Sequence, residues 1–191
     1  MRISRRLWLV AAVTALMVVS MTQIADAAGS SPVEATFATY NASLNRASEG
    51  ELIGDLSTPD NEQAQQVAEI IQRAAPEVLL VNEFDYDAGG VAAGLFQDNY
   101  LSVSQNGAAP IHYPYRYAAP SNTGVDSGVD LDGDGTIGGL GDDFGFGLFP
   151  GQFAFVVYSM HPIDYDGIRT FQHFRWADMP KALLPVNEDG S

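Results

Sequence analysis

The chain has 191 residues and a formal net charge of −15, with 24 acidic residues against nine lysines and arginines. Affinity for nucleic acid usually comes from lysine and arginine side chains that neutralise phosphates, so this composition disfavours duplex nucleic acid as a partner. The chain has no cysteine, which excludes disulfides as a source of stability.

The N-terminus has the composition of a secretory signal. Three arginines lie within residues 1–6, residues 7–21 are almost wholly apolar, and residues 25–27 form an A-x-A cleavage pattern. Cleavage there leaves residues 28–191, with a net charge of about −17. We expect a periplasmic or extracellular protein with no stable membrane association after cleavage. A retained anchor is the alternative, and the export route, Sec or twin-arginine, stays open.

A strand–helix–strand pattern opens the mature chain. Residues 36–41 alternate aromatic and β-branched residues, which predicts a strand, and residues 42–57 have the composition of a loop. The apolar run 78–81 predicts a strand that is buried on both faces. With a helix between them, the two strands form a βαβ unit, so we expect them to be parallel neighbours.

The intervening helix is the clearest element. Thr58 is a suitable N-cap, Pro59 suits the first helical position, and Pro76 ends the pattern. The apolar stripe that would face the sheet is Ala64, Val67, Ala68, Ile71 and Ala75.

The later part of the chain has weaker patterns. We predict a short helix within residues 91–100, a long ordered loop rich in glycine and aspartate over residues 121–151, and a strand over residues 152–159. A further strand is expected within residues 162–171. After residue 176 the composition is that of a loop.

Two polar residues follow the two predicted parallel strands. Asn41 lies at the end of the first strand, and Glu83 lies just beyond the second. The carboxyl ends of parallel strands open on the same side of a sheet, where ligands gather in α/β proteins. Oxygen ligands of this kind suit Mg²⁺, which keeps several waters. The alternative is that Glu83 is the first solvated residue of a loop and that Asn41 forms a turn.

Residues 130–137 match the front of an EF-hand-type calcium loop. The expected Ca²⁺ ligands are the side chains of Asp130, Asp132 and Asp134 and the backbone carbonyl of Thr136. Position 12 is Gly141 instead of a glutamate, so Asp142 or Asp143 would have to substitute. The alternative is a solvated acidic turn that binds no metal. If Ca²⁺ binds, its expected role is to neutralise like charges and to order the long loop.

Residues 37–41 and 77–85, together with residues 151–163, resemble the endonuclease/exonuclease/phosphatase superfamily in order and spacing, and residues 119–147 resemble a secreted bacterial branch of it. The resemblance implies an α/β fold, a two-sheet sandwich of which residues 28–191 form the N-terminal part. It also implies that Glu83 binds the catalytic Mg²⁺ and that Asn41 lies beside the metal. The catalytic histidine and the Asp-x-Asn pair of that family have no counterpart among these residues, which indicates a truncated domain.

We therefore expect a secreted, divalent-metal-dependent phosphoesterase that hydrolyses a phosphodiester or phosphomonoester. A small phosphoester or nucleotide is a better candidate substrate than duplex nucleic acid, and Arg116 is a weak candidate for binding its phosphate. The alternative is a non-enzymatic exported calcium-binding module. The three histidines, His112, His161 and His173, are expected to have structural or surface roles, and no protein partner is inferred.

Overall fold

The computed structural model describes residues 34–184, so the predicted signal, residues 1–27, lies outside the described residues. The secondary structure is mixed α/β, with the strands in one four-stranded sheet of order β1-β2-β4-β3. The strands are β1 (Phe37–Leu44), β2 (Val78–Phe84), β3 (Tyr115–Ala118) and β4 (Phe155–Ser159). Residues 34–184 therefore form one sheet of the expected two-sheet sandwich together with its helices, and they form no strand of the second sheet.

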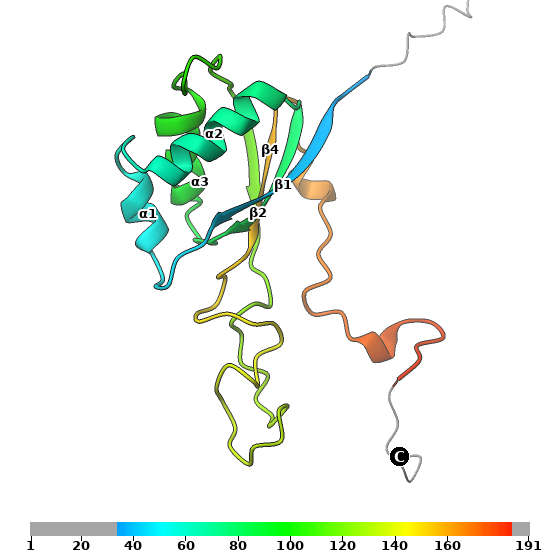
Figure 1. Cartoon of the computed structure of the whole chain (residues 1–191). Helices are drawn as coiled ribbons and strands as arrows, with labels where there is room; N and C mark the ends of the chain where they lie inside the picture. Colours follow the sequence, from blue (N-terminus) through cyan, green and yellow to red (C-terminus); the bar gives the residue numbers. More distant parts are fainter. Residues whose placement is uncertain (1–33, 185–191) are drawn as a thin grey trace, which may run out of the picture. The chain divides into compact units, whose positions relative to one another are not determined.

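The helices are α1 (Glu51–Leu56), α2 (Glu62–Ala74) and α3 (Val91–Phe96), which continues into a π-helical turn (Gln97–Leu101). Two short 3-10 helices, Tyr165–Gly167 and Trp176–Asp178, lie after β4. The three α-helices lie on one side of the sheet (Figure 1). Within the described residues, no helix is long and apolar enough to span a membrane.

The βαβ prediction is confirmed. β1 and β2 pair in parallel, and β4 runs antiparallel to both β2 and β3. Both predicted strands are longer than expected, because β1 extends to Leu44 and β2 to Phe84. Since β4 is antiparallel to β2, its N-terminal end lies at the carboxyl end of β2.

The N-cap of helix α2 lies three residues later than predicted. The side chain of Asn61, rather than that of Thr58, accepts a hydrogen bond from the Ala64 backbone N–H at 3.0 Å. The hydroxyl of Tyr100 donates to the Thr58 carbonyl and accepts from the Asn61 N–H, which holds residues 58–61 as a turn before the helix. At the other end, Ala75 has a left-handed backbone with φ 46° and terminates the helix.

Two further expectations were wrong, and one strand was not expected. Residues 42–57 are not all loop: α1 forms because Leu52 and Leu56, one helical turn apart, are both fully buried. β3 was not expected, because it is only four residues long and has an arginine at its second position. Residues 162–171 contain a 3-10 helix and no strand, because the chain leaves the sheet after Ser159.

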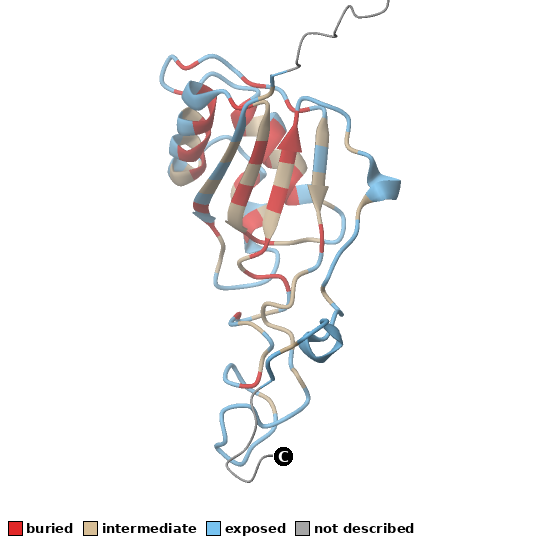
Figure 2. Cartoon of the chain, turned by 90° about the vertical axis from the view of Figure 1, so that its right-hand side faces the viewer, coloured by how far each residue is buried: buried red, intermediate tan, exposed pale blue. Residues whose placement is uncertain are grey.

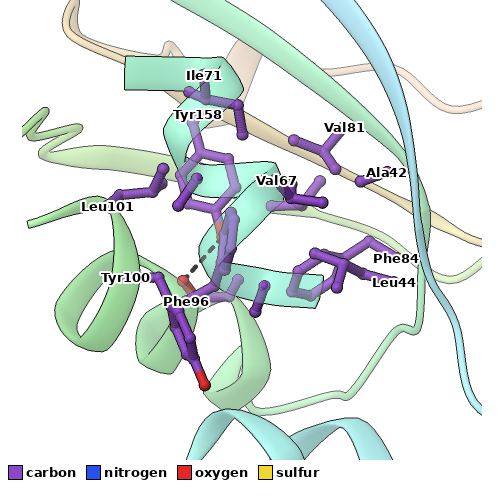
Figure 3. Close-up of a cluster of buried hydrophobic side chains, with 14 of the residues drawn as sticks. Ala42, Leu44, Val67, Ile71, Val81, Phe84, Phe96, Tyr100, Leu101 and Tyr158 are labelled. Atoms are coloured by element: carbon purple, nitrogen blue, oxygen red, sulfur yellow. Dashed lines mark hydrogen bonds between the residues drawn. The ribbon is translucent and has the colours of Figure 1, made fainter. Parts of the chain in front are cut away.

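The core lies between the helices and one face of the sheet. Leu79 and Val81 of β2 and Val156 and Tyr158 of β4 face the helices and are buried. Figure 3 shows Tyr158 beside α2 and near Phe96, and its hydroxyl donates to the Ala93 carbonyl at 2.9 Å. Burial raises the pKa of the Tyr158 hydroxyl far above its ordinary value, so this group stays protonated.

The opposite face of the sheet is only partly covered by the described residues (Figure 2). By strand register, Asn41, Asn82 and Phe155 form one row across this face, and Thr39, Leu80 and Val157 form the next. None of these six residues is buried. We call this surface the open face of the sheet.

Phe96 offers a test of the core. Its ring is fully buried and stacks at 5.9 Å, centroid to centroid, on Tyr100. We expect Phe96→Ala to lower the free energy of unfolding by about 3–5 kcal/mol, measured by urea denaturation. Phe144→Ala is the matched control, because Phe144 is 64% exposed, and its effect should stay within about 0.5 kcal/mol. Equal losses in the two variants would contradict this description of the core.

Candidate metal site at the carboxyl ends of β1 and β2

The pairing of β1 with β2 is irregular where both strands end. Asn41 pairs with Asn82, and the next pair is Leu44 with Phe84. Two residues of β1, Ala42 and Ser43, therefore lie opposite the single residue Glu83 of β2. This is the two-against-one arrangement of a β-bulge, which re-aims side chains and is frequent next to functional sites.

Two residues other than glycine have a left-handed backbone conformation at this bulge. Ser43 has φ 49° and Glu83 has φ 55°. Regular alternation would place Asn82 on the open face, Glu83 in the core and Phe84 on the open face. Instead Phe84 is 3% exposed and packs in the core. The left-handed backbone at Glu83 therefore interrupts the alternation of side chains along β2. As a result Phe84 faces the core, and the Glu83 carboxylate lies beside Asn41 instead of entering the core.

Three neutral side chains surround the Glu83 carboxylate. The amide of Asn41 donates to Oε1 at 2.7 Å, the hydroxyl of Ser43 lies 3.3 Å from Oε2, and the amide of Asn45 donates to Oε2 at 3.4 Å. The structure thus brings together Asn41 and Glu83, as the sequence predicted. It adds Ser43 and Asn45, which lie in a segment that was predicted to be a loop.

The orientation of the Asn41 amide follows from its neighbours. Its oxygen accepts from the Ser43 backbone N–H at 3.1 Å, and a backbone N–H is a donor only. The Nδ2 group must therefore face Glu83. In this arrangement the Asn41 amide supports the carboxylate, and its place beside the metal stays a prediction.

Within the described part of the chain, the Glu83 carboxylate has no cationic partner. Among residues 34–184 the ion pairs are Arg46–Asp55, Arg73–Glu69 and His161–Glu77, and none includes Glu83. The side chain is partly exposed, and its negative charge is balanced only by neutral donors. One carboxylate with solvent access fits Mg²⁺, which is usually held by one or two carboxylates and several waters.

Asp85 ties the site to its surroundings. Its buried carboxylate accepts from the Arg46 N–H at 2.7 Å and from the Phe153 N–H at 3.4 Å. It therefore links the segment after β1 to the segment before β4. Burial raises the pKa of Asp85, and the two backbone hydrogen bonds oppose this effect only in part.

The acidic loop forms a separate cluster. One carboxylate oxygen from each of Asp130, Asp132 and Asp134 lies within 4.8 Å of the others, and all three side chains are exposed. This arrangement could hold a metal ion. Gly141 lies against Asp132, so closely that a Cβ at position 141 would clash with its carboxylate. A side chain at position 12 would therefore require the Asp132 carboxylate to move.

Asp142, an expected substitute for the ligand at position 12, hydrogen-bonds to the backbone instead. The Asp142 carboxylate is buried and accepts hydrogen bonds from the backbone N–H groups of Leu131, Asp132 and Gly138. It closes the loop through the backbone and does not belong to the three-carboxylate cluster. The backbone of Asp143, the other candidate, forms an isolated β-bridge with Asp126, and its carboxylate is not part of the three-carboxylate cluster.

Arg116 does not lie with Glu83. It pairs with Tyr158 in the sheet register, so it projects on the helix side, opposite to the open face. It lines a cavity of about 350 Å³ together with Tyr86, Asp87 and Tyr165. A second cavity, of about 390 Å³, includes Phe155 of the open face and Arg169 in its lining.

His161 lies away from the cluster. His161 pairs with Glu77 at 2.5 Å, at the opposite end of β2 from Glu83. Within residues 34–184, no histidine forms a hydrogen bond with Glu83 or Asn41.

One sequence signal could have identified Ser43 and Asn45. Polar residues at positions 41, 43 and 45 alternate with Ala42 and Leu44, both of which are buried. This period of two indicates that the strand continues past Asn41 with its polar side chains on one face.

The model of the endonuclease/exonuclease/phosphatase family matches residues 38–191. No curated protein and no solved structure is significantly similar to the chain. The family match covers most of the chain, and its start coincides with β1. The chain belongs to the endonuclease/exonuclease/phosphatase family. At the level of the family it is a hydrolase of the phosphoesterase or nuclease type, and enzymes of this family generally use a divalent metal.

The raised pKa of Asp85 gives a pH-dependent prediction. As the pH rises from about 4, the unfolded chain loses this proton first, while the folded chain holds it until its own, higher pKa. The Asp85 contribution to the free energy of unfolding therefore falls as the pH rises through this window. The free energy of unfolding of the wild type minus that of Asp85→Asn should decline with pH and then level off, measured by urea denaturation in a pH series. A difference that rises with pH would contradict the shift.

Proposed function

We propose that the chain is an exported, magnesium-dependent phosphoesterase domain in which Glu83 is the metal-binding carboxylate. One observation carries the proposal: at the carboxyl ends of two parallel strands, a left-handed backbone turns Glu83 onto the open face, where only neutral donors surround it. The family match supports the reaction class, because its members are hydrolases of this type.

The described residues have distinct roles in this proposal. Glu83 offers the carboxylate oxygens, and the Asn41 amide fixes one of them. Asp85 holds the two segments that flank the site. When bound, Mg²⁺ polarises a phosphoryl oxygen and stabilises the leaving oxyanion. No described histidine is hydrogen-bonded at the cluster.

The charge of the chain supports a small substrate. At a net charge of −15, a polyanion is repelled except where bound cations screen it. A phosphomonoester, a small phosphodiester or a nucleotide carries fewer charges. The cavity of about 390 Å³ includes Phe155, which lies in the same row of the open face as Asn41, so a leaving group could extend toward Arg169 there.

Export is proposed from the sequence of residues 1–27. The arginine-rich start, the apolar run and the A-x-A pattern support a cleaved signal and a periplasmic or extracellular location.

Replacement of Glu83 tests the proposed enzyme. In the protein at its natural length, Glu83→Gln should lower Mg²⁺-dependent hydrolysis of bis-p-nitrophenyl phosphate by at least about 100-fold, because the amide removes the charge that binds the metal. Glu69→Gln is the matched control, since Glu69 pairs with Arg73 on the surface of α2 and should leave turnover unchanged. Wild-type turnover in Glu83→Gln would show that Glu83 does not carry the metal.

A second candidate function, calcium binding, is favoured by the close approach of Asp130, Asp132 and Asp134. We propose that Ca²⁺ binds here, with the Thr136 carbonyl as a further ligand, and orders a loop that no disulfide restrains. This function is compatible with the enzyme and does not require it.

Ca²⁺ at about 100 times its Kd should stabilise the folded chain by about 2.7 kcal/mol. This stabilisation corresponds to a rise in Tm of about 5–10 °C. Asp132→Asn should remove most of this rise in differential scanning calorimetry, whereas Asp166→Asn, at an exposed position outside the cluster, should retain it. A rise of equal size in Asp132→Asn would place the Ca²⁺ elsewhere.

A further inference from the structure

The open face at Glu83 contains two polar residues to which the family match and the motifs assign no role. Ser43 and Asn45 follow Asn41 at intervals of two residues, and both reach Oε2 of Glu83. We propose that Ser43 and Asn45 are positioning residues, which hold the Glu83 carboxylate in the orientation that binds the divalent cation. This inference rests on the proposed metal-binding role of Glu83.

The three donors divide the two carboxylate oxygens between them. Asn41 donates to Oε1, and Ser43 and Asn45 donate to Oε2. A carboxylate has about four lone-pair sites, two on each oxygen, so Oε1 keeps a site for a cation while the two bonds at Oε2 restrict the rotation of the carboxylate. The bonds from Ser43 and Asn45, at 3.3 and 3.4 Å, are longer than the 2.7 Å bond from Asn41, so each should contribute less than Asn41 does.

Ser43 acts on the carboxylate by a second route. Its backbone N–H and its hydroxyl both lie within hydrogen-bond distance of the Asn41 amide oxygen, at 3.1 and 3.4 Å. These contacts turn the Asn41 Nδ2 group toward Glu83. The Ser43 hydroxyl has one proton, which is shared between Asn41 and Glu83. Loss of the hydroxyl therefore weakens support for both carboxylate oxygens.

The segment that carries these donors is fixed on both sides. The carbonyl of Ser43 accepts from the Gln63 side chain of α2 at 2.7 Å, and the N–H of Arg46 donates to Asp85 at 2.7 Å. Donors on a segment held in this way cost little reorganisation when a cation arrives, which is the requirement for a preorganised site.

Because of the backbone conformation of Ser43, two substitutions can distinguish a role of its hydroxyl in metal binding from a role in folding. At φ 49° a Cβ is unfavourable, and glycine adopts this conformation without strain. Ser43→Ala and Ser43→Gly both remove the hydroxyl, but only Ser43→Gly relieves the strain. If the hydroxyl positions Glu83, both variants lose metal affinity, and Ser43→Gly retains the higher Tm of the two.

The test is isothermal titration of the 191-residue chain with Mg²⁺ alone, with Tm recorded for every variant. Because the acidic loop also binds cations in our proposal, the titration can contain two binding events. The event that Glu83→Gln removes is the one that belongs to this site. Ser43→Ala, Ser43→Gly and Asn45→Ala should each weaken that event by about tenfold. Ser57→Ala should leave it within twofold, because Ser57 caps the end of α1, outside the cluster.

The outcomes separate the two proposals. If Glu83→Gln removes a binding event that Ser43→Ala and Asn45→Ala leave unchanged, the positioning roles are wrong and the metal-binding role of Glu83 stands. If Ser43→Gly binds Mg²⁺ as tightly as the wild type, the hydroxyl is not needed to position Glu83, and its proposed role is wrong. If Glu83→Gln leaves the titration unchanged, the proposed function fails, and this inference fails with it.

Discussion

The left-handed backbone at Glu83 is the constraint on which both the core and the site depend. A single φ of 55° lets Phe84 enter the core and sends the preceding carboxylate to the open face. Such a conformation costs about 1–3 kcal/mol for a residue other than glycine and persists only where the surroundings determine it. Here the buried Phe84 ring, 6.1 Å from Phe96, and the three donors on the carboxylate determine it together.

The bulge in β1 matches this turn in β2. Because β1 has one residue more than β2 between the last two pairs, Ser43 lies opposite Glu83 and brings its hydroxyl to the carboxylate. The result is a negative charge that is oriented, partly exposed and uncompensated by a cation. In a chain with 24 acidic residues, each such site favours a divalent cation over an anionic ligand. The same electrostatic argument applies to the Asp130 loop, where the carboxylates are exposed and lie on one short segment.

The sequence predicted the elements that have strong periodicity, which are α2, β2 and β4, and the parallel pairing that brings Asn41 to Glu83. It did not predict α1, because Leu52 and Leu56 lie in a segment rich in glycine and serine, and their burial is a tertiary effect. It also did not predict the bulge or the turned backbone at Glu83, since no glycine marks either position and packing of Phe84 determines the geometry. The misplaced strand at 162–171 arose from apolar residues that the structure leaves outside the sheet.

The most direct test is a crystal structure of the protein soaked in Mn²⁺, with an anomalous difference map. Mn²⁺ takes oxygen ligands similar to those of Mg²⁺ and scatters anomalously. The account predicts a peak about 2.0–2.2 Å from a Glu83 carboxylate oxygen, with Asn41, Ser43 and Asn45 still hydrogen-bonded to that carboxylate. Anomalous density at the Asp130 loop alone, with Glu83 free of metal, would contradict it.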